Sequence, residues 1–412
     1  MTSTGATAGR ALIVGLGISG MAAAISLHRA GWEPVIVERA PGRRTGGYFI
    51  ALFAPGQKAA QRLGILHDIH DRWPPNCASY MVDRAGRRKP SLTFPPNARP
   101  YMVLRGDVER AAYQGLPPGV EIRYSTTPTR IEQDGHGVTV TLDQGGATVT
   151  ERFDLVVGAD GLRSTVRRLV FGPHERFLHR LGYMIAAFTP PGPIGGHAGH
   201  EIISLFEPDR SLWLNPFKDH PPSVLFSYRT DDVDAQFRGR PVDRIREAYG
   251  PERPGRLLGE AIDAFDAADT YLFDSADQVR MDSWSRGRVV LLGDAAWCAT
   301  LYSGMGASTG LAGADLLGTM LEHHRGDIRA ALSEWESRLR PFISECQQAG
   351  VQRRLFFTPG TKMQIAIRPL LARAVQLPLL GPVLNRAAGR TGKNQQKYDA
   401  IFDVDVKVHA AA

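Results

Sequence analysis

The sequence of 412 residues has only three cysteines, and no two of them form a Cys-x-x-Cys pair. An odd number of widely spaced cysteines argues against a disulfide framework, and the lack of a Cys/His cluster argues against a structural zinc site. The sequence also lacks an apolar run of about 18 residues, so we expect no membrane-spanning helix. The first nine residues have no apolar signal-peptide centre. These absences predict a cytoplasmic protein without a metal site.

Acidic residues are scarce in one part of the chain. Residues 351–412 contain ten Lys or Arg against three Asp, and the rest of the chain is balanced, so the net charge of +7 arises here. Such a segment can contact nucleic acid or anionic lipid, but no nucleic-acid-binding motif accompanies it. We interpret it as a solvated helical surface and expect neither a nucleic acid nor a membrane partner. A membrane contact, if made, would involve residues 360–412.

The rest of the composition is typical of a globular protein, with 43% apolar and 22% charged residues. A chain of this length is long for one compact core, so more than one domain is expected.

The strongest single pattern lies near the N-terminus. Residues 12–14 predict a buried strand that runs directly into Gly15, Gly17 and Gly20, with the spacing Gly-x-Gly-x-x-Gly. The first glycine allows a tight turn, the second lets the backbone approach a pyrophosphate, and the third lets the next helix pack on the sheet. A second strand ends at Glu38, whose carboxylate can bind ribose hydroxyls. An acid at this position predicts NAD or FAD rather than NADP as the tightly bound dinucleotide.

Another buried strand that leads into a glycine-containing turn is predicted over residues 153–158. It leads into Asp160-Gly161, a sharp turn close to the nucleotide, and then into a helix that begins at Ser164. An ordinary helix cap is the alternative interpretation of Asp160.

A third buried strand, over residues 287–292, leads into Gly293-Asp294 and a glycine-rich loop that opens a helix over about 304–323. Asp294 can accept hydrogen bonds from the hydroxyls of a sugar alcohol. The backbone N–H groups of residues 304–307 lie where the helix dipole suits an electron-rich ring edge that becomes anionic. An NAD enzyme has no need of this second site, whereas a flavin with its ribityl chain does.

The region between these patterns has a different character. Pro-rich loops separate the strands of a predicted antiparallel sheet, and two helices follow. The expected strands are 181–188, 201–206, 212–214 and 224–229, and the expected helices are 242–249 and 257–265. A strand–turn–strand pattern covers 79–94, a helix is expected to begin at Met102, and the C-terminal residues are expected to be helical over 328–354 and 365–384.

At the three strand–glycine patterns the sequence resembles the FAD-dependent monooxygenases of the p-hydroxybenzoate hydroxylase type, over about residues 10–350. It is most similar to bacterial members that modify polyketides or inactivate tetracyclines. The resemblance implies an α/β fold in which a Rossmann-type FAD-binding domain carries an inserted antiparallel-sheet substrate domain and C-terminal helices. We predict an FAD-binding domain (1–78, 96–172 and 281–325), a substrate-binding domain (79–95 and 173–280) and a C-terminal helical segment (326–412).

The resemblance implies FAD as the bound cofactor, with Asp294 at the ribityl–pyrophosphate region. It also implies that Arg105 and Asp160 contact FAD or its surroundings. The full set of candidate FAD-binding residues is Gly15, Gly17, Ser19, Gly20, Glu38, Arg39, Arg44, Gly47, Arg105, Asp160, Gly161, Gly293, Asp294, Gly304, Gly306 and Ala307. The chain departs from the family at Trp297, where His is frequent, and at Leu301, where Pro is usual. Both departures bear on the packing around the flavin ring.

The resemblance further implies that NADPH or NADH reduces FAD transiently, because the chain has one dinucleotide fingerprint. One atom of O₂ is then inserted into an aromatic or polyketide-like small molecule through a flavin C4a-hydroperoxide, by hydroxylation or epoxidation. Because the cofactor carries this chemistry, no catalytic residue is singled out. The candidate substrate residues are Tyr183, Trp213, Tyr228 and Arg229, with plain core packing as the alternative for the aromatic ones. A monomer or homodimer is expected.

Three other functions are weighed against this interpretation. A flavin-dependent halogenase would carry a Trp-x-Trp-x-Ile-Pro stretch, which Trp213-Leu-Asn-Pro does not match. A flavin reductase or desaturase of the same fold would insert no oxygen, and labelled O₂ would distinguish it. A flavoprotein that binds a reactive intermediate with little catalysis would oxidise NAD(P)H slowly even with its ligand present.

Overall fold

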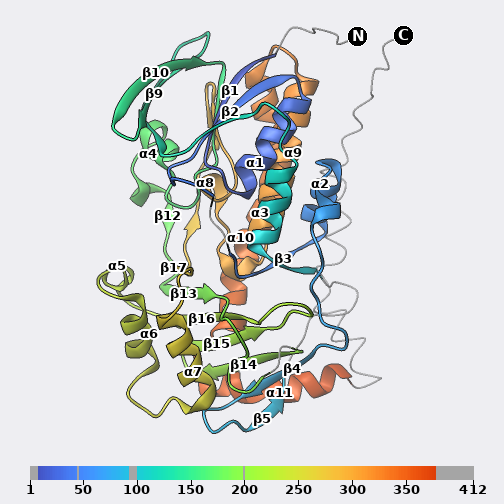
Figure 1. The fold of residues 1–412 in the computed structure, drawn as a ribbon, viewed down its shortest axis with the longest axis vertical. Helices are drawn as coiled ribbons and strands as arrows, with labels where there is room; N and C mark the ends of the chain where they lie inside the picture. The colour runs from blue at the N-terminus through green and yellow to red at the C-terminus, as the bar shows by residue number, and fades with distance from the viewer. Residues whose placement is uncertain (1–7, 44–45, 92–99, 198–199, 377–412) are drawn as a thin grey trace.

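The computed structural model describes residues 8–43, 46–91, 100–197 and 200–376. Figure 1 shows an elongated molecule in which the segments β1, β2, α1 and α9 occupy one end, while β13–β16, α6 and α7 occupy the other. The long helix α10 runs between the two ends.

A six-stranded sheet forms the first end of the molecule. Four of its strand pairs are parallel, and β19 pairs with β20 in the antiparallel sense. The predicted strand that precedes the first glycine motif is its centre, because β1 lies between β11 and β2. The strands, in spatial order, are β19 (Ser285–Arg286), β20 (Val289–Leu291), β11 (Leu155–Gly158), β1 (Gly9–Val14), β2 (Trp32–Val37) and β7 (Glu121–Arg123).

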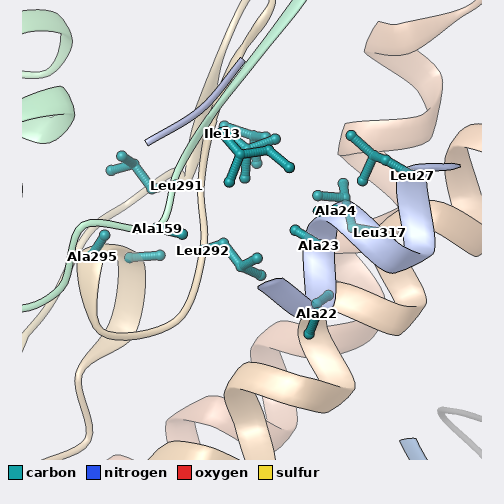
Figure 2. Close-up of a cluster of buried hydrophobic side chains, with 14 of the residues drawn as sticks. Ile13, Ala22, Ala23, Ala24, Leu27, Ala159, Leu291, Leu292, Ala295 and Leu317 are labelled. Atoms are coloured by element: carbon teal, nitrogen blue, oxygen red, sulfur yellow. The ribbon is translucent and has the colours of Figure 1, made fainter. Parts of the chain in front are cut away.

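Two helices rich in small residues pack closely on this sheet and on each other. A Cβ added at Gly318 of α9 would lie 2.1 Å from Ser26 Oγ of α1, so the glycine permits the contact. Figure 2 shows Ala22, Ala23 and Ala24 of α1 facing Ile13 and Leu292, which come from the sheet side of the same core. The helices around this core are α1 (Ile18–Arg29), α2 (Ala54–Arg62), α3 (Arg105–Gln114), α4 (Thr165–Val170), α8 (Asp294–Trp297) and α9 (Gly306–His323).

The helix expected to begin at Met102 starts three residues later. Tyr101–Leu104 instead forms strand β6, which pairs with β3 (Phe49–Leu52). The backbone N–H groups of these apolar residues are used in this two-stranded ladder, and α3 begins only at Arg105. A separate antiparallel sheet contains β8 (Thr126–Gln133), β9 (Val138–Gln144) and β10 (Ala147–Phe153).

A seven-stranded, mostly antiparallel sheet forms the other end. Helices α6 (Pro241–Tyr249) and α7 (Gly255–Asp266) cover one face, where Phe226 packs against Phe265 and Tyr249. In spatial order the strands are β17 (Leu272–Ser275), β13 (Tyr183–Phe188), β16 (Ser223–Arg229), β15 (Arg210–Asn215), β14 (Glu201–Glu207), β4 (Ala78–Val82) and β5 (Arg88–Pro90). The pattern over 79–94 is found with a shift: its second strand, expected at 91–94, is β5 at Arg88–Pro90, and residues 92–94 lie outside the described residues.

The C-terminal part is helical, as expected. Helix α10 (Ile328–Phe357) contains Pro341 in its interior, and α11 (Lys362–Gln376) follows after a short turn. The helix expected over 365–384 is seen as far as Gln376, and the remainder lies outside the described residues. None of the described helices is both long and apolar enough to cross a membrane. The minor elements are β12 (Leu178–His179), β18 (Gln278–Val279) and α5 (Val233–Gln236).

Candidate active site

The three predicted strand–loop patterns meet at one edge of the parallel sheet. Val14 of β1 lies beside Gly158 of β11, and Gly158 lies beside Leu291 of β20. The loops that follow these residues therefore leave the sheet side by side, at the carboxyl ends of parallel strands. This edge is where open α/β sheets bind their ligands.

The three glycines of the first motif have different surroundings. A Cβ at Gly15 would lie 2.6 Å from the Ala159 carbonyl oxygen, and a Cβ at Gly20 would lie 1.9 Å from the Gly15 carbonyl oxygen. The packing of the protein therefore requires these two glycines. A Cβ at Gly17 would have no neighbour within 4 Å, so this position faces open space in which a ligand can approach the backbone.

The N-terminus of α1 is suited to bind an anion. The N-cap Gly17 has no side chain to accept from the first N–H groups, and the first turn of α1 contains no acidic residue. These N–H groups and the positive end of the helix dipole suit a phosphate. The Ser19 side chain, a predicted cofactor contact, packs against the Gly293 loop and against α9, because a Cβ at Gly293 or at Gly310 would lie 2.4 Å from its Oγ.

Glu38 holds the glycine loop in place. One of its carboxylate oxygens accepts a hydrogen bond from the Leu16 N–H at 2.9 Å, and the other accepts from the Ala40 N–H at 2.8 Å. Each carboxylate oxygen has a further lone pair, so the group can still accept from a ribose hydroxyl. Arg39 beside it is exposed, and Arg44 lies outside the described residues.

Asp294 is the first residue of α8. The residue is exposed to solvent, yet desolvation by the surrounding protein raises the pKa of its carboxyl group, and the nearby Cys298 thiol and Arg105 charge act against this rise. A Cβ at Gly306 would lie 3.9 Å from its Oδ1, which places the carboxylate beside the first turn of α9. That turn, which also contains Ala307, has no side-chain cap and no acidic residue. Hydroxyl donors and an electron-rich group can therefore be bound side by side.

Asp160 acts as a helix cap. Its Oδ1 accepts from Ser164 Oγ at 2.5 Å, and its Oδ2 accepts from the N–H groups of Thr165 and Val166 at 2.6 and 3.1 Å. The helix-cap interpretation of Asp160 therefore describes its side chain, which holds the loop in place. Gly161 follows with φ of +78° and open space at its Cβ position, so its backbone remains accessible.

Arg105 and Gly47 form a close contact between two loops. The Arg105 N–H donates to the Tyr48 carbonyl oxygen at 3.0 Å, and a Cβ at Gly47 would lie only 2.7 Å from the Gly106 nitrogen. The Arg105 guanidinium pairs with Glu109 at 2.8 Å. Its positive charge also acts on the pKa values of both Tyr48 and Asp294, lowering each against the stronger effect of burial. Arg105, Tyr48 and Asp294 thus share one electrostatic environment.

The comparisons with known proteins agree with this arrangement. A family model described as "FAD binding domain" matches residues 9–343. An uncharacterized protein of Mycobacterium tuberculosis is 32% identical over 352 residues, which cover 82% of this chain and 91% of the relative. A flavin-dependent monooxygenase from an unidentified prokaryote is 29% identical over 353 residues, covering 82% and 87%. The structure of tetracycline destructase Tet(51) is 26% identical with a TM-score of 0.74, covering 90% of this chain and 99% of that one.

The chain belongs to this family of FAD-binding proteins. It is an FAD-dependent monooxygenase of the p-hydroxybenzoate hydroxylase type, so the family resemblance and the predicted fold class are confirmed. The residues at the sheet edge fit FAD on structural grounds. Gly17 leaves space at a helix N-terminus without a side-chain cap, and Asp294 is an accessible acceptor beside a second such terminus, that of α9.

Strand alternation divides the predicted substrate residues of this monooxygenase. Tyr183 and Trp213 lie on the sheet face that packs against Tyr302 and Phe357, and the partly buried Tyr48 belongs to the same cluster. We refer to this cluster as the aromatic face. The aromatic face adjoins the FAD-binding loops, because Tyr48 directly follows Gly47.

Tyr228 is on the opposite face of the sheet, so the structure does not bring it together with Tyr183 and Trp213, and its substrate role stays a prediction. Its hydroxyl donates to Gln236 Oε1 at 2.9 Å, and its ring packs in the core under α6 and α7. Side chains alternate along a strand, and Tyr228 has the phase of Phe226. Arg229, at the end of β16, lies opposite Tyr183 in the strand register, is exposed, and pairs with Asp209 and Asp231 at 4.0 and 3.7 Å, so its substrate role stays a prediction.

Both departures from the family pattern have visible consequences. Trp297 is buried against Trp284 and Trp335, at ring distances of 4.7 and 5.7 Å. A Cβ at Gly313 would lie 2.9 Å from the Trp297 ring, so α9 provides room for the indole in the core. Leu301 packs at the edge of the aromatic face and follows Thr300, a β-branched residue with a φ of +69°. Such a backbone conformation is costly for threonine and occurs mostly at functional sites.

Sequence reasoning missed two residues that organise the site. Arg167 is fully buried and donates hydrogen bonds to the carbonyl oxygens of Leu162 and Ala295, which lie in the second and third loops. Tyr48 joins the FAD-binding loops to the aromatic face. The position of Tyr48 directly after Gly46-Gly47 is a signal that could have found it, whereas nothing in the sequence distinguishes Arg167 from the neighbouring arginines.

Proposed function

We propose that this flavoprotein consumes NADPH or NADH and inserts one oxygen atom from O₂ into an aromatic or polyketide-like small molecule, by hydroxylation or epoxidation. The observation that carries the proposal is the position of Tyr48. It contacts the FAD-binding loops on one side and belongs to the aromatic face on the other. Flavin and substrate would therefore meet at this residue.

Bound FAD, once reduced by the nicotinamide, would supply the activation of O₂. The chain itself provides binding and orientation. The N–H groups at the start of α1 would hold the pyrophosphate, Glu38 the ribose, and Asp294 the ribityl hydroxyls. The first N–H groups of α9 would face the ring edge that becomes anionic on reduction.

The aromatic face favours a flat, apolar substrate with few polar groups. Tyr183 and Tyr302 meet edge to face at 5.8 Å, and Trp213 packs against Phe206 at 5.1 Å. One chain of hydroxyl groups crosses this region: Tyr302 Oη and Thr358 Oγ1 each lie 2.7 Å from Ser227 Oγ. The likeness to tetracycline destructase Tet(51), whose name refers to a fused-ring polyketide, supports the same substrate class.

The test is spectroscopic and kinetic. The purified protein should show a flavin absorbance spectrum, and NADPH or NADH oxidation under air should accelerate with a matching compound from an aromatic and polyketide panel. Product formed under ¹⁸O₂ should then carry one labelled oxygen. Product without label would support a reductase or desaturase instead, and ligand binding without acceleration would support a binding flavoprotein.

A further inference from the structure

Helix α11 presents its apolar side to solvent. Met363, Ile367, Leu370 and Leu371 are 73%, 44%, 62% and 42% exposed. Their spacing of four, three and one residues places them on one side of a helix. We call these four residues the α11 stripe. An amphipathic helix of a globular protein normally packs such a stripe against the core. In α11 the stripe is exposed to solvent instead.

The opposite side of α11 is the one that packs on the protein. Arg368 and Ala372 are buried there, and Ile365 contacts the aromatic face. The Arg368 guanidinium lies over the rings of Phe206 and Phe356, at 4.1 and 4.8 Å, and donates to the Phe356 carbonyl oxygen. The helix therefore buries a cation while it exposes four large apolar side chains. The α11 stripe is not required for docking α11 onto the sheet.

Exposed apolar side chains are concentrated in this one region. Leu355 and Phe356, at the end of α10, are also exposed, and Phe356 contacts α11 through Arg368. Among the described residues, the other large exposed apolar side chains are Phe237 and Tyr271, which lie elsewhere. An exposed apolar patch such as the α11 stripe marks an interaction surface.

The charge of the surrounding chain identifies the partner. Arg354, Lys362 and Arg373 flank the patch, and the sequence has no acidic residue between Glu345 and Asp399. A second copy of the chain would bring like charges together across a symmetric contact, which disfavours self-association. An apolar stripe flanked by Lys and Arg suits an anionic lipid surface, with the stripe at the headgroup boundary and the cations at the phosphates.

We propose that α11 docks this enzyme on anionic bilayers, lying in the interface rather than crossing it. Figure 1 places α11 at the end of the molecule remote from β1 and β2, so docking would leave the FAD-binding loops free. The proposal is independent of the substrate class, since it rests on the α11 stripe and its charge.

The test is co-sedimentation of the full-length protein with vesicles of phosphatidylcholine alone or of phosphatidylcholine with phosphatidylglycerol. We expect binding to the anionic vesicles that exceeds binding to the neutral ones at least about tenfold and weakens at high salt. The double variant Met363→Ser/Leu370→Ser should lose at least about tenfold in affinity, because two apolar side chains no longer leave water. Lys362→Glu/Arg373→Glu should lose anionic selectivity.

A matched control separates this proposal from folding defects and from dimerisation. Tyr271→Ser removes a large side chain that is 46% exposed elsewhere on the protein and should leave vesicle binding unchanged. All variants should keep the flavin spectrum of the parent. Equal binding to both vesicle types, or unchanged binding of the stripe variant, would overturn the proposal. So would a dimer of the parent in solution that the stripe variant converts to a monomer.

Discussion

The guanidinium of Arg167 donates a hydrogen bond to the Ala295 carbonyl oxygen at 2.8 Å, across 128 residues of sequence. A second hydrogen bond reaches the Leu162 carbonyl oxygen at 2.6 Å. Arg167 follows the cap formed by Asp160, whereas Ala295 follows Asp294. One buried cation therefore connects the two loops that contain the aspartates.

Replacing Arg167 by Met should destabilise the protein and weaken FAD binding together. Two buried carbonyl oxygens would lose their donor, at about 1–3 kcal/mol each, and the Asp294 loop would lose its attachment. Thermal unfolding with and without FAD would measure both effects. Arg168→Met, one residue on and exposed, is the control. A melting temperature unchanged in Arg167→Met would contradict the connecting role.

Alanine at Gly17 and alanine at Gly20 should differ in their effect on the stability of the protein without FAD. Gly17→Ala adds a methyl group in open space and at φ of −83°, so the stability without FAD should stay within about 0.5 kcal/mol. Its FAD affinity should fall, since the pyrophosphate loses its close approach. Gly20→Ala places the Cβ 1.9 Å from a carbonyl oxygen and should unfold the site. Calorimetry and FAD titration of both variants test this; equal loss of stability would refute the distinction.

Glu38→Gln should lower FAD affinity by about 10–100-fold. The amide retains one acceptor oxygen, so one of the Leu16 and Ala40 N–H groups would face an NH₂ group, at a cost of about 1–3 kcal/mol. Flavin fluorescence titration measures the affinity. Glu33→Gln, on the exposed side of β2, should bind FAD normally. A comparable loss there would show that the effect is one of overall charge.

His174 should make the protein less stable in mild acid. Desolvation, followed by the nearby Arg167 charge, lowers its pKa below 6.5, and its Nδ1 lies 3.2 Å from the Arg167 guanidinium as an acceptor. Below pH about 6.5, His174 is protonated to a greater extent in the unfolded state than in the folded state. The free energy of unfolding therefore falls as the pH falls. His174→Gln should remove this part of the pH dependence, and His67→Gln should not. Melting curves at several pH values provide the comparison.

Replacements of Trp213 and Tyr228, which lie on opposite faces of the seven-stranded sheet, should have different effects on KM. Trp213→Leu alters the aromatic face and should raise KM by about tenfold, or about 1.4 kcal/mol of substrate binding. Tyr228→Phe removes a hydroxyl on the opposite face and should leave KM unchanged with a small loss of stability. A larger KM effect at Tyr228 would place the substrate under α6 and α7.

Much of the FAD-binding part could be predicted from sequence because its glycines are tied to backbone geometry. Gly15 and Gly293 adopt positive φ, and Gly20 packs against another main chain, so each restricts the local structure by itself. Asp160 was harder, since a carboxylate at a strand–helix turn can bind a ligand or cap a helix with the same sequence signal.

The substrate side could be predicted less well. Nearly all residues of β13 and β16 are buried, on both faces of the sheet. The sequence therefore shows no alternation of apolar and polar residues that would tell which face Tyr228 lies on. Met102–Leu104 forms a strand only because β3 offers a partner. The role of Arg167 depends on two carbonyl oxygens supplied by distant loops, which local sequence does not encode.

Helix α10 has a consequence for how the molecule unfolds. Its 30 residues extend over about 45 Å. Trp335 near one end belongs to the core under the parallel sheet, whereas Phe357 at the other end packs against Trp213. Neither core can melt without exposing part of this shared helix, so the two halves should unfold as one cooperative unit, although each half has a large sheet of its own.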